Sequence, residues 1–157
     1  MLDLLSIESK IKIAMKKEYF SQPSPALALH RSMFILQQQA DELLLNQTGV
    51  GLSQVRIMSQ LHFSVPRSQR TVATMLRQTE ANVSRQLQTM KKQGLVSVER
   101  NRKDRRIREV TLTQKGTKTY QKAEKVLERH YDQLEKLWGG AEAKDLTKSL
   151  QQLNKIF

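Results

Sequence analysis

Residues 80–93 place apolar and polar side chains on opposite sides of a predicted helix. Val83, Leu87 and Met90 repeat at helical spacing and form an apolar stripe. The opposite side carries Ala81, Arg85, Gln88 and Lys92, with Asn82 and Ser84 beside them near the helix start. A helix of this kind can be anchored in protein on one face while the other enters the major groove of a duplex. Arg85 suits guanine and Asn82 or Gln88 suits adenine, whereas Thr79, the first backbone amides and Lys92 suit phosphate.

A second group of residues with a chemical signature follows this helix. Residues 85–108 contain nine Lys or Arg side chains against two acidic ones, in a chain whose net charge is +12. Residues 101–106 combine Arg102, Lys103, Arg105 and Arg106 with Asp104. A long guanidinium in such a loop can enter a narrow minor groove, where the negative potential is deepest. Since Asp104 would repel phosphate, we expect it to pair with a nearby Arg and fix the loop's shape.

Short helices and two strands are predicted to position these residues. Ser53 is expected to cap one short helix, Ser68 a second that contains Val72, and Thr79 the helix over 80–93. Gly94 would end that helix in the left-handed conformation. The apolar period then changes to two, which predicts strands over 95–100 and 107–113 joined by the charged loop. Residues 115–116 are expected to end the strand region.

Longer helices flank this centre. Residues 1–20 predict a short amphipathic helix, and Ser24 with Pro25 begins a helix to about Asn46 that ends near Gly49 and Gly51. After the strands, the sequence predicts a long helix to about Trp138 and a last helix reaching Phe157. Their apolar stripes are too long for the small centre to cover, so we expect a second copy of the chain. The predicted organisation is an extension (1–23), a dimerisation helix (24–50), a DNA-binding module (51–113) and C-terminal dimerisation helices (114–157).

Composition excludes several classes of function. The 157 residues include no cysteine, which removes disulfides, thiolate metal sites and a cysteine nucleophile. No nucleophile–base pair, phosphate loop or paired-carboxylate site is found, so the chain is predicted not to be an enzyme and to need no cofactor. His30, His62 and His130 lie on different predicted helices without ligand spacing, which argues against a metal site. No apolar run could span a bilayer and no signal peptide is found, so a cytoplasmic protein without a membrane partner is expected.

Residues 72–116 resemble the MarR/SlyA family of winged helix-turn-helix transcription factors. The likeness rests on Val72-Ala73 and Leu76, on Val83-Ser84-Arg85, on Gly94-Leu95-Val96 and, most specifically, on Asp104-Arg105-Arg106 followed by Leu112-Thr113 and Gly116. Beyond them it extends by helix order over 24–157. Arg77 and Gln78 replace a glycine and an apolar residue common in the family's turn. Ser97-Val98 stands where Glu-Arg is frequent, so that strand arginine is missing and Arg100 is expected to contact phosphate instead.

The resemblance implies a mainly α (α+β) fold, a winged helix-turn-helix with long dimerisation helices and a two-stranded β wing. It also implies a homodimer on a pseudo-palindromic double-stranded operator, and a small-molecule effector bound between dimer helices and winged module. The family's base-contacting positions fall on Ala81, Asn82 and Arg85, and its minor-groove arginine on Arg106. Candidate effector-lining residues, which would serve equally well as core residues, are Tyr19, Phe20, Phe34, Phe63 and Trp138. The predicted DNA-binding residues are Ser68, Arg70, Thr79, Ala81, Asn82, Ser84, Arg85, Gln88, Lys92, Arg100, Arg102, Lys103, Arg105 and Arg106.

Two other classes remain open at this point. A low-specificity architectural or RNA-binding protein would bind with a steep salt dependence but without preferring an operator over random duplex. A winged-helix module that docks an acidic protein would have no affinity for any duplex. An anionic membrane is disfavoured, because the charge lies in a hairpin and not opposite an apolar helix face.

Overall fold

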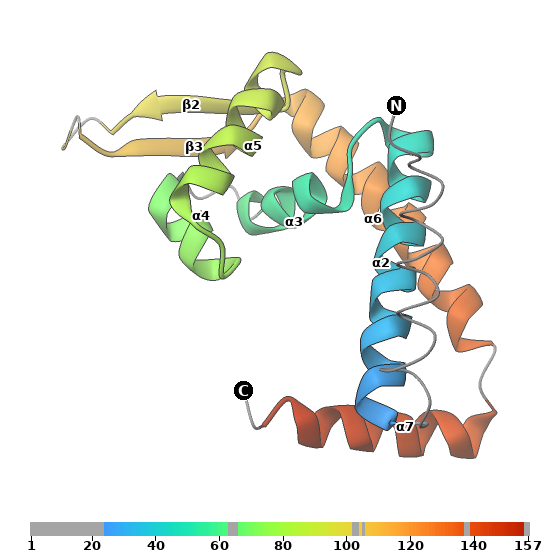
Figure 1. Ribbon diagram of the computed structural model, residues 1–157. Helices are drawn as coiled ribbons and strands as arrows, with labels where there is room; N and C mark the ends of the chain where they lie inside the picture. The colour runs from blue at the N-terminus through green and yellow to red at the C-terminus, as the bar shows by residue number, and fades with distance from the viewer. Residues whose placement is uncertain (1–23, 63–65, 102–103, 105, 137–138, 156–157) are drawn as a thin grey trace, which may run out of the picture. The chain divides into compact units, whose positions relative to one another are not determined.

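The computed structural model describes residues 24–62, 66–101, 104, 106–136 and 139–155, which fall into two compact units, one ending at Gln39 and one beginning at Ala40. The elements are α2 (Pro25–Thr48), α3 (Leu52–Leu61), β1 (Arg67–Ser68), α4 (Gln69–Met75), α5 (Glu80–Lys92), β2 (Val96–Arg100), β3 (Arg108–Leu112), α6 (Gln114–Glu135) and α7 (Gly140–Leu153) (Figure 1). The helix predicted over 1–20 lies outside the described residues. Among the described helices, none combines the length and the apolar character needed to cross a membrane.

The starts of the two central helices follow the sequence prediction. The Ser68 side chain accepts from the Thr71 N–H at 3.0 Å, and the Thr79 side chain accepts from the Asn82 N–H at 3.3 Å. Each satisfies a backbone donor that the first helical turn leaves unpaired.

The predicted cap at Ser53 is wrong. Helix α3 begins at Leu52 with Gly51 as its N-cap, at φ −84°. Two side chains supply the missing acceptors: Asp41 Oδ1 accepts from the Leu52 N–H at 2.7 Å, and Gln54 Oε1 from the Gly51 N–H at 3.2 Å. Of the two glycines expected to relieve a positive φ at the exit of α2, Gly49 does so at +73° and Gly51 does not.

The sheet has three strands rather than the predicted two. Strands β2 and β3 pair antiparallel from Val96 opposite Leu112 to Arg100 opposite Arg108. Strand β1 adds Arg67 opposite Val110 on the other edge of β3, giving the order β1-β3-β2. A strand of two residues has no readable period, which is why the sequence did not reveal it.

One apolar core holds the central elements together. Ile57 and Met58 of α3, Val72 of α4, Met90 of α5 and Val110 of β3 are fully buried. The core also takes in residues beyond the predicted boundaries of the central module: Leu44 of α2, Val50, and Tyr120, Ala123 and Val126 of α6. The first half of α6 therefore packs as part of the central module, while the predicted domain boundaries themselves stay a prediction.

Helix α6 begins earlier than predicted. Thr113, expected to end the second strand, is its N-cap and accepts from the Gly116 N–H at 3.0 Å. Gly116, expected to end the strand region, is buried in the first turn, where a Cβ would stand 2.0 Å from the Leu95 carbonyl oxygen. Further along, burial first and then Glu124 raise the pKa of the Tyr120 phenol, which donates to the Glu124 carboxylate.

Several of the exposed apolar side chains lie on α2 and on α7. In the first unit, Met33, Phe34 and Ile35 of α2 are exposed. Helix α7 has no buried residue, and its Leu146 and Leu153 are exposed. Faces of this kind usually mark an interaction surface.

Candidate nucleic-acid interface

Helix α5 divides its side chains as the periodicity predicts. Val83, Leu87 and Met90 are buried in the core and hold the helix from one side. The predicted outer face is open to solvent at four positions: Ala81, Arg85, Gln88 and Lys92. Asn82 and Ser84, predicted beside that face, are half-buried. The helix thus presents a small residue and three long polar side chains on a rigidly anchored support.

The turn between α4 and α5 has the hydrogen bonds of a Schellman motif. The Gln78 N–H donates to the Ala73 carbonyl at 2.9 Å, and the Arg77 N–H donates to the Thr74 carbonyl at 3.1 Å. Arg77 occupies the left-handed position with φ 52°, where glycine is the usual residue. Among the described residues it is the one non-glycine with a positive φ. The exposed Arg77 guanidinium was not among the predicted contact residues, although the sequence showed a glycine replaced there.

Polar side chains surround the exposed start of α5. Ser68 and Thr79 serve as helix caps, and the Thr79 hydroxyl proton remains available to an acceptor such as phosphate. Arg70 is 85% exposed, and its Nε lies 3.8 Å from Glu80 Oε1. A surface pair of this kind contributes little stability, so the guanidinium can turn toward another anion.

A side-chain network joins the turn to α5. Gln78 Oε1 accepts from Asn82 Nδ2 at 3.2 Å and from Gln86 Nε2 at 3.1 Å. The predicted base-reading residue Asn82 is therefore held by a residue outside the helix. Gln78 and Gln86 were not among the predicted contact residues, because nothing in the spacing of the sequence connects them to Asn82.

The β2–β3 ribbon projects from the helices (Figure 1) and separates opposite charges onto its two faces. Residues directly opposite each other in an antiparallel pair lie on the same face, and the face alternates along the strand. Val98 lies opposite Val110, and beyond them Arg100 lies opposite Arg108. The other face carries Glu99 opposite Glu109.

This arrangement of the ribbon has an electrostatic cost. Like charges directly opposite each other destabilise a strand pair. Arg100 and Arg108 are nevertheless paired in this way and exposed, so the end of the ribbon presents a cationic face suited to an anion. Arg108 was not among the predicted contact residues, whereas Arg100 was.

At the ribbon's tip, Asp104 contacts the backbone of the loop. Its Oδ1 accepts from the Arg106 N–H at 2.9 Å, and its own N–H donates to Asn101 Oδ1 at 2.9 Å. The Ile107 N–H closes the turn on the Asp104 carbonyl at 3.0 Å. Arg106 is exposed. Arg102, Lys103 and Arg105 lie outside the described residues. Toward Arg106, which is described, Asp104 makes a backbone hydrogen bond and not the predicted ion pair with an arginine.

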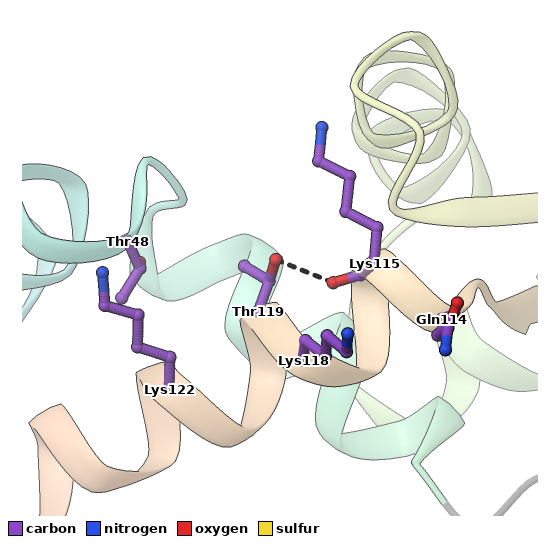
Figure 2. Close-up of a pocket in the computed structure, with 6 residues that line it drawn as sticks. All are labelled: Thr48, Gln114, Lys115, Lys118, Thr119 and Lys122. Atoms are coloured by element: carbon purple, nitrogen blue, oxygen red, sulfur yellow. Dashed lines mark hydrogen bonds between the residues drawn. The ribbon is translucent and has the colours of Figure 1, made fainter.

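A separate hollow lies along α6, and its described lining residues are not among those predicted to contact DNA (Figure 2). Its volume is about 450 Å³, and it is lined by Thr48, Gln114, Lys115, Lys118, Thr119 and Lys122. Within it, Thr119 Oγ1 donates to the Lys115 carbonyl at 2.9 Å, and Lys115 Nζ reaches the Gln93 carbonyl at 2.8 Å. Of the aromatic residues predicted to contact an effector, Phe34 is not among the described residues of the lining. Tyr19, Phe20, Phe63 and Trp138 lie outside the described residues.

The histidines show no shared site. In the part of the chain that the structure describes, His, Asp and Glu side chains do not gather in threes around a point that could hold a metal ion. His130 is buried on α6, and its ring lies 5.8 Å from that of Tyr131. The ring of His62 lies 4.8 Å from that of Tyr120.

The arrangement of α4, the turn, α5 and the three-stranded sheet defines a winged helix-turn-helix protein. Solved structures share it. The chain matches the transcriptional repressor CouR bound to a 23-mer DNA duplex with a TM-score of 0.74 and 25% identity, over 83% of this chain and 92% of that one. It matches an S. aureus MepR–DNA complex with a TM-score of 0.74 and 17% identity, over 87% and 100%. It matches a MarR mutant from E. coli complexed with operator DNA with a TM-score of 0.67 and 18% identity, over 82% of this chain and 94% of that one.

Sequence comparison shows which family the central part of the chain resembles. A MarR family profile matches residues 48–107. The HTH-type transcriptional regulator BilQ of Clostridium symbiosum (strain WAL-14163) is 33% identical over 88 residues, which are 56% of this chain. The chain spans 61% of the length of that relative. Residues 48–107 therefore match the MarR family, and the solved structures share the winged helix-turn-helix, which confirms the resemblance and the fold class predicted from the sequence.

Proposed function

We propose that this protein is a homodimeric, sequence-specific transcriptional regulator that binds double-stranded DNA. In this proposal the outer face of α5 enters the major groove and the ribbon tip enters the minor groove. The observation that carries it is the presence of two polar surfaces in one module. The anchored helix α5 exposes Arg85, Gln88 and Lys92, and the ribbon carries Arg100 and Arg108 side by side. The relatives named as DNA complexes share this fold.

Dimerisation is part of the proposal. The exposed apolar side chains of α2, and separately those of α7, are surfaces that a second copy of the chain would cover. Two recognition helices related by a twofold axis would contact half-sites about 34 Å, or about 10 base pairs, apart. Release by a small effector, a cytoplasmic location and a non-enzymatic role complete the proposal.

The direct test is a gel shift on duplexes selected from a random pool. Arg85→Ala is expected to weaken operator binding and to relax base preference by about 1–3 kcal/mol, the range for a lost bidentate contact. Arg106→Ala is expected to weaken binding through the minor groove. Arg129→Ala removes the same charge from the exposed side of α6 and serves as the matched control.

The outcomes separate the classes of function. Binding of both interface variants as tightly as the wild type would refute the assignment. Equal affinity for selected and random duplex at physiological salt would favour the low-specificity protein. No affinity for any duplex at low salt would favour a module that docks an acidic protein.

A further inference from the structure

Gln78 occupies a defined place between the two helices of the DNA-binding motif. Its backbone N–H closes the Schellman motif of α4 on Ala73, and the next residue, Thr79, caps α5. The backbone on both sides of Gln78 is therefore fixed by hydrogen bonds. Its half-buried side chain then reaches over the first turns of α5.

The side-chain carbonyl of Gln78 has two donors. Asn82 Nδ2 lies at 3.2 Å and Gln86 Nε2 at 3.1 Å from Oε1, one helical turn apart along α5. A carbonyl oxygen has two lone pairs, so these two bonds use the whole capacity of the acceptor. The oxygen of Gln78 is thus held from both sides and in turn fixes the direction of the Asn82 amide.

A fixed amide has a consequence for base reading. The Asn side chain carries two N–H donors and one carbonyl acceptor. Adenine is read by one N–H and the carbonyl together. Asn82 can give one N–H to Gln78 and still present its other N–H and Oδ1, in one orientation only. Without that bond the amide could rotate and would lose part of its discrimination between donor and acceptor patterns.

We infer that Gln78 is a positioning residue for Asn82 and, through it, a determinant of base specificity. The inference rests on the proposed function, since it needs a duplex to be read. It assigns the specificity at one base pair to a residue in the turn that does not itself contact that base. Position 78 therefore requires an acceptor oxygen on a carbonyl carbon that follows two flexible methylene groups.

The test uses base preference as its readout. Selection from a random pool with the wild type and with Asn82→Ala identifies the base pair that Asn82 reads. Gln78→Met, which keeps length but removes the acceptor, is expected to lower the preference at that base pair about fivefold, the effect of one lost neutral hydrogen bond. Preference at the other positions is expected to stay. Gln78→Glu keeps an acceptor for both donors and is expected to retain the preference, although its charge lowers affinity for every duplex alike.

A matched variant and a measurement without DNA complete the design. Gln86→Met removes the second donor but leaves the bond between Gln78 and Asn82, and is expected to keep the preference. In the free protein, NMR should show one of the two Asn82 side-chain amide protons protected in the wild type and in Gln78→Glu, and neither in Gln78→Met.

The contrary results are distinct. Unchanged preference in Gln78→Met, or an equal loss at every base position, overturns the positioning role while the proposed function stands. Loss of preference in Gln78→Glu as large as in Gln78→Met shows that Gln78 does not act as an acceptor and overturns it too. A wild-type protein that selects no sequence overturns both the proposed function and this inference.

Discussion

The two helices of the DNA-binding motif end in the same backbone geometry with different residues. At the end of α5, the Leu95 N–H donates to the Met90 carbonyl at 2.9 Å and the Gly94 N–H to the Lys91 carbonyl at 3.0 Å. The end of α4 repeats this pattern with Gln78 and Arg77 as donors. The left-handed residue is Gly94 at φ 71° in one case and Arg77 at φ 52° in the other.

The hydrogen bonds around the ends of α4 and α5 differ as well. The carbonyl of Gly94 accepts from Thr113 Oγ1 at 2.7 Å, and the next carbonyl, of Leu95, accepts from the Thr113 N–H at 3.0 Å. The start of α6 is therefore hydrogen-bonded to the end of α5. The left-handed residues of both ends, Gly94 and Arg77, are exposed to solvent. A side chain in the left-handed region costs about 1–2 kcal/mol, and this cost falls at the turn that directly precedes α5, the helix proposed to enter the major groove. Strain kept at such a place suggests a functional residue.

The largest expected effect concerns the contact between α6 and the end of α5. In Gly116→Ala the new Cβ would lie 2.0 Å from the Leu95 carbonyl oxygen, which is backbone and cannot rotate away. Helix α6 would have to shift from the base of the sheet, and we expect a loss of about 3 kcal/mol in the free energy of unfolding. Urea titration measures it.

Gly140→Ala is the control for that change. Nothing lies within 4 Å of a Cβ at Gly140, which begins α7. We expect equal or slightly higher stability there, because alanine favours a helix over glycine. Equal stability of the two variants would show that α6 does not press on the end of α5.

A smaller effect is expected from placing a Cβ at Gly94, the left-handed residue that ends α5. In Gly94→Ala the nearest atom is Lys115 Cδ at 4.0 Å, so only the positive φ resists the substitution. We expect a loss of about 1 kcal/mol, measured by thermal unfolding. Gly49→Ala, at φ 73° with no atom within 4 Å, should lose the same amount. A much larger loss at Gly94 would mean that the contact with α6 adds to the cost of the positive φ.

The smallest effect is expected at the end of α4, where the left-handed residue Arg77 carries a side chain. Arg77→Gly relieves the left-handed strain but increases the freedom of the unfolded chain, so we expect a net gain of about 0.5 kcal/mol in the free energy of unfolding. Differential scanning calorimetry can resolve the shift. A destabilised variant would show that the Arg77 side chain makes stabilising contacts, and the two exits would then differ in energy as well as in residue type.

Local signals in the sequence were sufficient for the elements that present the site. The caps Ser68 and Thr79, the left-handed Gly94 and the apolar stripe of α5 each depend on residues within a few positions of one another. The structure agrees with all of them.

Features set by distant residues could not be predicted. Gly51 begins α3 because Asp41, one element earlier, accepts from the Leu52 N–H. Strand β1 exists only through its pairing with β3. Gly116 was placed at the end of a strand because the sequence does not reveal the Leu95 carbonyl above it. The acceptor role of Gln78 was missed for a different reason: its partners lie only four and eight positions away, but amide groups carry no periodic signal.

The carboxylates of Glu99 and Glu109 give the ribbon a sidedness that acts before any close contact forms. A polyanion that approaches the face with the two glutamates meets two negative groups, whereas one that approaches the other face meets Arg100 and Arg108. Long-range fields of this kind bias the orientation of a diffusional encounter. Collisions on the glutamate face would then be short-lived. The rate of productive association would depend on the glutamate face of the ribbon as well as on its arginine face.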